Sequence, residues 1–469
     1  MTMAQTRRDF LRNSACALGS MALASSIDNF SVVHALTPQA ASDYRALVCV
    51  FLNGGNDGNN MFVSLDQYAA YAAARDAAQL SIPQASFLPV SPVSGGSYGF
   101  HPSMPEMQSL FNQGKLAVLC NSGPLVEPLT RTTYQNGTGK KPLQLFSHSD
   151  QVSLYDTAIS NSVSQTGWGG RLADKTALLN GAASFPTNVS IAGVNLFLTG
   201  VDTRQLAVAD SGTSLANVLV LNNAPGATTA EINSRSSAFN SIRGFDNDFK
   251  LVKAASDIRS SSIQTDNALG TVNPTLATTF PNTTLGRQLK QVALLMKAST
   301  DATAGINMKR QIFFTQLGGF DTHSAQLSGQ GSLLTQVSQA ISAFFSATTE
   351  LGLQNKVTLF TMSDFSRTLQ PSGSGAAAVG SDHAWGNHHL IVGGSVLGHT
   401  LYGTYPNLTP GGPDDTDGGT SPRGRWIPTT SVEQYAATLA TWYGLSSADL
   451  SAVFPLIGRF PTSNLGFLS

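Results

Sequence analysis

Apolar residues along the chain gather in short continuous runs, and stretches with helical spacing separate them. The runs at 46–52, 115–120, 311–316 and 357–360 are rich in Val, Leu, Ile and Phe, which is typical of buried strands. Helical patterns lie between or after these runs, at 104–112, 167–179, 285–298, 332–352 and 432–443. Apolar strands that alternate with helices predict an α/β protein with a mainly parallel sheet.

Three of these strands end in residues that commonly bind metals. The first strand runs into a glycine- and asparagine-rich segment that contains Asp57, the third reaches Asp321 and His323, and the fourth ends at Asp364. Ligands of open α/β sheets bind outside the carboxyl ends of the strands, so we expect these side chains to converge. Several carboxylates in one crevice would repel each other without a cation, which favours a metal site.

The segment after Asp364 adds more residues of the same kinds. We interpret it as a loop rich in Gly, Ser and Ala that carries Asp382, His383, His388 and His389. Carboxylates combined with imidazoles suit Zn²⁺, Mn²⁺ or Fe better than Ca²⁺, which prefers oxygen ligands alone. The alternative for each residue is an ordinary hydrogen-bonding role, such as an Asx turn at Asp57.

A second candidate feature lies where a helix opens within 143–158. A short strand-like run there reaches Ser147, His148, Ser149 and Asp150. A hydroxyl at such a position is normally a helix cap. The same place can also bind an anion or present a serine nucleophile.

The N-terminus has the order of an export signal. Arg7 and Arg8 precede a weakly apolar run at 14–26, as in twin-arginine signals. The run is too short and too rich in small residues to span a membrane. Cleavage after Ala24 or Ala35 fits the pattern, and Ala35 is favoured because the first strand starts near residue 45.

We therefore expect a signal peptide at 1–35 and one domain at 36–469, located in the periplasm or secreted, with no stable membrane span after signal removal. The stretch at 186–280 is rich in Ser, Asn, Thr and Ala and is interpreted as a cap or insertion over the sheet. A net charge of −1 without a basic block argues against a nucleic-acid partner. Cys49 and Cys120 lie in apolar runs, so we expect buried free thiols, with a disulfide as the alternative.

Several segments together resemble one protein family. They are FLNGGNDGNN, LFSHSDQ, GGFDTH, TMSDFSRT, SDH and WIPTTSVEQYAATLATWYG, and they are similar to the DUF1501 family of exported bacterial proteins. That family is a distant member of the alkaline phosphatase and sulfatase-like superfamily, and the resemblance covers nearly all of the mature chain. It implies an α/β/α three-layer sandwich with a mixed, mainly parallel sheet. It also implies one or two divalent ions, usually zinc, at the strand ends.

The resemblance also implies roles for single residues. Asp57 resembles the aspartate that binds the metal nearest the nucleophile, and Asp321 with His323 resembles the ligand pair of the other metal. Asp364 resembles the aspartate of the T-x-A-D-H signature. His383, or failing it His388, would be the last histidine.

The catalytic roles carried over by the resemblance are fewer. Ser147 is the candidate nucleophile with His148 beside it, and Ser149 is the fallback. Arg367, or the helix end after Ser147, would hold a nonbridging oxygen of the ester. Phe365 stands where the signature has a histidine. Consequently the chain holds a single ion, replaces the missing ligand with Asp382 or His388, or keeps only a relic of the site.

Together these features predict an exported metal-dependent hydrolase of phosphate or sulfate esters, with a small-molecule or polymer substrate that the sequence does not identify. The alternative is a noncatalytic exported binding or assembly protein that keeps the fold. A redox protein is disfavoured because the chain has no CxxC pair, haem-attachment motif or dinucleotide fingerprint.

Overall fold

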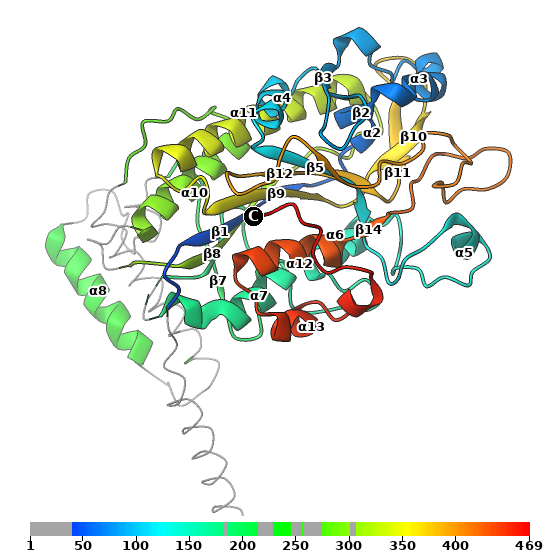
Figure 1. Ribbon diagram of the computed structural model, residues 1–469. Helices are drawn as coiled ribbons and strands as arrows, with labels where there is room; N and C mark the ends of the chain where they lie inside the picture. Colours follow the sequence, from blue (N-terminus) through cyan, green and yellow to red (C-terminus); the bar gives the residue numbers. More distant parts are fainter. Residues whose placement is uncertain are drawn as a thin grey trace, which may run out of the picture.

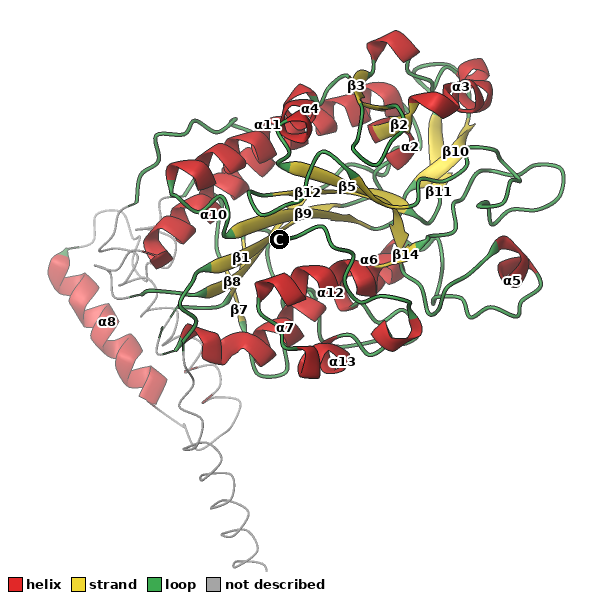
Figure 2. Cartoon of the chain, viewed as in Figure 1, coloured by secondary structure: helices red, strands yellow, loops and turns green. Residues whose placement is uncertain are grey.

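The computed structural model describes residues 40–181, 183, 185–213, 228–244, 253, 256, 274–300 and 306–469. Figures 1 and 2 show a central sheet with helices packed on both of its faces. This arrangement confirms the predicted α/β/α sandwich. The expected signal peptide at 1–35 lies outside the described residues, and so does much of the expected insertion at 186–280.

The main sheet has nine strands in the described part of the chain. Across the sheet their order is β13 (Leu401–Gly403), β5 (Leu116–Gly123), β12 (Asn387–Val392), β9 (Val357–Ser363), β1 (Arg45–Leu52), β8 (Arg310–Leu317), β6 (Asn188–Ser190) and β7 (Gln205–Ala207), with β14 (Thr430–Ser431) beside β5. All neighbours are parallel except β12, which runs antiparallel between β5 and β9. The first residues of β12 therefore lie at the edge where its neighbours end.

Alternation along β1 divides the interior into two cores, because successive side chains of a strand point to opposite faces. One set, including Val48 and Val50, packs with α4 (Pro105–Asn112), α10 (Thr284–Thr300) and α11 (Gln326–Glu350). The other set, including Leu47 and Phe51, packs with α7 (Trp168–Thr176) and α12 (Val432–Tyr443). Burial of each large apolar side chain contributes about 1.5–3 kcal/mol. The sheet is therefore fixed from both sides (Figure 1).

The two described cysteines follow the same division. Cys49 belongs to the core on the α12 side, and Cys120 belongs to the core on the α11 side. Both are buried and free. The expectation of buried thiols is confirmed, because the sheet itself separates the two sulfur atoms.

Other elements complete the fold around the sheet. They are α2 (Gly58–Met61), β2 (Phe62–Ser64), α3 (Tyr68–Arg75), β3 (Leu88–Val90), β4 (Tyr98–Phe100), α5 (Arg131–Gln135), α6 (His148–Thr157), α8 (Thr229–Gly244), β10 (Arg367–Ser372), β11 (Gly380–His383) and α13 (Leu450–Val453). Within the described residues, no helix combines the length and hydrophobicity that a bilayer span requires.

Two segments contain strands where a loop or an insertion was expected. The expected loop at 382–389 contains the end of β11 and the start of β12, so His388 and His389 lie on a buried strand. The described start of the expected insertion contributes β6 and β7 to the main sheet, and the expectation of a cap over the sheet stays a prediction for the rest of 186–280. In both places short strands form hydrogen bonds with a neighbouring strand of the sheet. The sequence pattern does not show which strand will be the neighbour.

The start of α7 depends on close approach of two backbones. Gly167 and Gly170 donate their amides to the carbonyls of Thr199 and Phe197. A Cβ at Gly170 would collide with the backbone of Thr199. Glycine is therefore required here to hold the loop after β6 against the helix.

We expect Gly170→Ala to lower the free energy of unfolding by about 1–3 kcal/mol, because the added methyl group must displace backbone. Urea denaturation would measure the loss. Gly458→Ala is the control, since a Cβ there meets no neighbouring atom. Equal stability of the two variants would contradict the role assigned to Gly170.

Candidate metal centre

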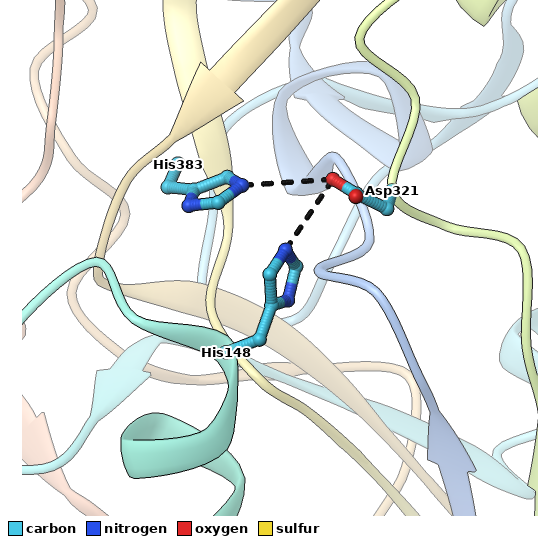
Figure 3. A group of neighbouring side chains, drawn as sticks. All are labelled: His148, Asp321 and His383. Carbon is cyan, nitrogen blue, oxygen red and sulfur yellow. Dashed lines mark ion pairs between the residues drawn. The ribbon is translucent and has the colours of Figure 1, made fainter.

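Three predicted residues converge at the carboxyl edge of the sheet. His148 is the first residue of α6, Asp321 follows β8, and His383 ends β11. Their ligand atoms lie within 4.8 Å of one another (Figure 3). Oδ1 of Asp321 is 3.4 Å from Nε2 of His148 and 3.6 Å from Nε2 of His383. We call these three residues the His–Asp cluster.

A buried carboxylate orients His148. Nδ1 of His148 is 2.7 Å from Oδ2 of Asp364, and the other oxygen of Asp364 accepts the amide of Gly54 at 3.0 Å. A carboxylate only accepts, so Nδ1 carries the hydrogen, and in the neutral ring Nε2 has the lone pair that faces Asp321. That Nε2 atom is buried and has no hydrogen-bond partner. Asp364 is thus a positioning residue behind the cluster and not a direct member of it.

A backbone carbonyl orients His383. Nδ1 of His383 lies 2.7 Å from the carbonyl oxygen of Phe146, which has a left-handed φ of 71°. Nδ1 must donate in this bond, so Nε2 again presents a lone pair. Partial burial lowers the pKa of His383, and the charges of Arg367 and His148 lower it further, against the hydrogen bond to Phe146. The ring is therefore neutral at pH 7 and able to bind a cation.

His323 borders the cluster on its solvent side. Its Nε2 is 3.0 Å from Oδ1 of Asp321 and 3.1 Å from Nε2 of His383. Its Nδ1 faces Oδ1 of Asp382 at 3.6 Å, and Arg423 holds the other oxygen of Asp382 at 2.7 Å. His323 is thus placed to add a further nitrogen, whereas Asp382 supports it from behind.

Arg367 has a different role from the one expected. Its side chain is fully buried, and its N–H groups donate to Asp321 and to the carbonyls of Gly54, Gly55, Phe320 and Ser381. Nη1 also lies 3.4 Å from Nε2 of His323, so every donor of Arg367 has a partner within the protein, contrary to the predicted contact with an ester oxygen. Partial burial would raise the pKa of Asp321, but the hydrogen bond and charge of Arg367 outweigh this effect and lower it. Arg367 therefore keeps Asp321 ionised.

Phe365 fills the place next to the cluster. Its ring lies 4.7 Å from the ring of His148 and 4.6 Å from that of His383, measured between centroids. A side chain on Gly55 would collide with the same ring. Phe365 thus supplies an apolar wall and no ligand, which limits the number of donors at this edge.

Asp57 does not join the cluster, contrary to prediction. Its carboxylate forms a fully buried ion pair with Arg75 at 2.6 Å, caps Asn59 at 3.0 Å and accepts from Gln326 at 2.5 Å. Arg75 supplies the cation that was expected to be a metal. This pairing could not be predicted, because Arg75 ends α3, a helix with no recognisable motif.

His388 was also wrongly expected as a ligand. It is 97% buried, its Nδ1 accepts the amide of Asn121 at 3.1 Å, and its ring stacks on Tyr405. Burial lowers the pKa of His388 to about 3. The neighbouring His389 stacks on Tyr435, and burial lowers its pKa to about 3 as well. Both are neutral core histidines.

Ser147 lies one residue before His148, at the N-cap of α6. Its hydroxyl donates to Oδ2 of Asp150 at 2.6 Å and lies 3.3 Å from the hydroxyl of Ser149. The proton acceptor of Ser147 is therefore Asp150 and not His148.

Comparison with known proteins places the chain in a family. Residues 44–414 match the family described as "Protein of unknown function (DUF1501)". The chain belongs to the DUF1501 family. A sequence search of curated proteins found no match.

Some solved structures resemble this DUF1501 protein at low similarity. The lipoteichoic acid synthase LtaP from Listeria monocytogenes is 8% identical, with a TM-score of 0.35 over 88% of this chain and 75% of that one. The PsFucS1 sulfatase from Pseudoalteromonas sp. is 9% identical, with a TM-score of 0.30 over 82% and 68%. A Vibrio parahaemolyticus protein of the alkaline phosphatase superfamily is 9% identical, with a TM-score of 0.30 over 86% and 67%. Values this low carry no argument about activity.

We expect Arg75→Met to lower the free energy of unfolding by about 3–5 kcal/mol, because Asp57 would remain as an uncompensated buried charge. Urea denaturation would measure the loss. The double variant Arg75→Met with Asp57→Asn should recover part of it, since both charges are then removed. Failure of the second substitution to recover any stability would contradict the ion-pair assignment.

The buried acids Asp156 and Glu433, whose pKa values burial raises to about 8 and about 7, gain stability as the pH falls from 7 to 5. Against this gain, we expect the two core histidines to reduce stability between pH 7 and pH 5. Their pKa in the folded protein is about 3, below the unfolded value of about 6.5. The unfolded chain therefore binds protons first. Stability is fully present above pH 6.5 and is lost as the pH falls toward 3.

The expected loss from pH 7 to pH 5 is about 2 kcal/mol for each histidine. Urea midpoints at the two pH values would measure it. Relative to the unchanged protein, a His388→Gln, His389→Gln variant should gain about 4 kcal/mol of stability between pH 7 and pH 5, because the loss from both histidines is removed. An unchanged dependence would show that other groups control acid stability.

Proposed function

We propose that this protein is an exported hydrolase of phosphate or sulfate esters that depends on one divalent metal ion bound at the His–Asp cluster. The observation that supports this most is the buried Nε2 of His148, which has no hydrogen-bond partner and faces Asp321. Buried polar atoms normally have partners, and an unpaired nitrogen beside a carboxylate is suited to a cation. Export by the twin-arginine route, indicated by Arg7 and Arg8, is part of the proposal.

The donor set fits a metal of the zinc, manganese or iron type. His148, His383 and Asp321 supply two imidazole nitrogens and one carboxylate oxygen, and His323 can supply a third nitrogen. Each histidine has a partner behind it, as metal-binding histidines usually do. Asp364 is that partner for His148. One ion is favoured over two, because Arg75 occupies Asp57 and Phe365 supplies no ligand.

Such an ion would neutralise charge on the ester and lower the pKa of a water molecule or serine hydroxyl. The protein itself would hold the cluster in place through Asp364, the Phe146 carbonyl and Arg367. Ser147 is the alternative nucleophile to water, and Asp150 is placed to accept its proton. The helix end at α6 would hold the ester oxygen in place of Arg367, because a helix N-terminus favours anions.

A noncatalytic binding or assembly role is the second candidate. The pairing of Asp321 with Arg367 favours it, since the carboxylate is already neutralised without a metal. In that case the cluster would be a polar network that stabilises the strand ends. The noncatalytic protein could keep one structural metal, so metal content and turnover together separate the two functions.

We expect the protein to bind about one zinc or manganese ion per chain, and His148→Ala or His383→Ala to weaken that binding at least tenfold. Metal analysis after purification from the periplasm, with equilibrium dialysis, would measure this. Turnover of p-nitrophenyl phosphate, bis(p-nitrophenyl) phosphate and p-nitrophenyl sulfate would then be assayed. Ser147→Ala should abolish turnover only if the serine is the nucleophile.

The double variant Arg75→Met, Asp57→Asn is the matched control, because it removes a predicted ligand that lies outside the cluster together with its buried counter-ion and should keep the metal. Retention of stoichiometric metal in an Asp321→Ala, His323→Ala variant would refute the site. Absence of both metal and turnover would support the noncatalytic role.

A further inference from the structure

We propose that a cavity beside the His–Asp cluster binds an uncharged part of a ligand that carries several hydroxyl or amide groups. The cavity has a volume of about 330 Å³ and lies between the ends of β1 and β8, the helix α6 and the loop after β6. This inference rests on the proposed function and describes the substrate at the same site. The apolar part of the lining is Phe51, Val152, Leu196 and Phe314. The polar part is Asn53, Ser149, Ser153, Asp156, Asn195 and Gln316.

Two residues that line the cavity are next in sequence to residues of the cluster or its support. Ser149 belongs to the first turn of α6, one residue after His148. Asn53 precedes Gly54, whose amide binds Asp364. These neighbours place the cavity on the same edge of the sheet as the cluster, and under the proposal a ligand with an ester group at the cluster extends into it.

The lining favours an uncharged ligand. No lysine, arginine or histidine lines the cavity among the described residues. Asp156 is 96% buried, and its Oδ1 has no hydrogen-bond partner. Burial, together with the charge of Asp364, raises the pKa of Asp156 to about 8, against a backbone hydrogen bond from Phe197. At pH 7 the carboxyl group is therefore neutral and can both donate and accept.

Other polar groups of the lining are also available. The side-chain amides of Asn53 and Gln316 and the hydroxyl of Ser153 make no hydrogen bond within the described part of the chain. Together with Asp156 they present several donors and acceptors to one small space. Its volume is at the lower end of known ligand pockets, which suits a single sugar-sized ring.

The test compares three probes that share a ring but differ in charge: N-acetylglucosamine, glucosamine and glucuronate. Binding to the full-length mature protein would be followed by ligand-observed NMR with a chelator present, so that the His–Asp cluster does not contribute. We expect N-acetylglucosamine to bind and each charged probe to bind at least tenfold more weakly, because nothing in the cavity compensates a charge.

Two substitutions of Asp156 make the test specific. Asp156→Asn keeps a neutral hydrogen-bonding group of similar shape and should retain binding within about threefold. Asp156→Leu should weaken binding at least tenfold, and its Tm is measured alongside because the substitution also removes the acceptor of the Phe197 amide. The Tm measurement separates lost recognition from lost folding.

Absence of N-acetylglucosamine binding, equal binding of a charged probe, or unchanged binding to Asp156→Leu would each overturn the proposal. These results are independent of metal content and turnover. The proposed hydrolase activity can therefore fail while the cavity assignment stands, and the reverse also holds.

Discussion

The buried guanidinium of Arg367 fixes the geometry at the carboxyl edge of the sheet. It binds carbonyl groups that follow β1 and β8 and one on β11, and it also binds the carboxylate of Asp321. A buried cation must find several acceptors or pay a large desolvation cost. Satisfying that demand draws three distant segments together. The positions of the other site residues follow from this arrangement.

Charge compensation explains why only some strand-end carboxylates form a candidate site. Asp57 is matched by Arg75 inside the protein, so it is fully neutralised without any ligand. Asp364 is matched by one histidine and one amide. Asp321 is about half exposed and has imidazoles as well as Arg367 around it. All three places have an acid. Among them a cation can bind only near Asp321, because this carboxylate is exposed and has imidazole nitrogens with unused lone pairs beside it.

The sequence was sufficient to predict the main architecture, because continuous apolar runs such as 46–52 and 311–316 leave few alternatives to buried parallel strands. The rule that strand ends share an edge placed Asp321, His323 and Asp364 together. His148 was expected at the site only from the family resemblance, as the neighbour of Ser147. The sequence did not predict that Arg75 pairs with Asp57 or that the carbonyl of Phe146 orients His383. An ion pair between distant residues and a carbonyl fixed by its φ angle have no local signature. His388 was misjudged because a short antiparallel strand buries it.

The contact between Phe146 and His383 links backbone conformation to imidazole chemistry. The two residues are 237 positions apart, yet the carbonyl direction at Phe146 decides which ring nitrogen of His383 bears hydrogen. If the peptide plane at Phe146 turned over, the opposite tautomer would be favoured and the lone pair would point away from Asp321. The loop before α6 therefore determines whether His383 behaves as a donor or as an acceptor at this edge of the sheet.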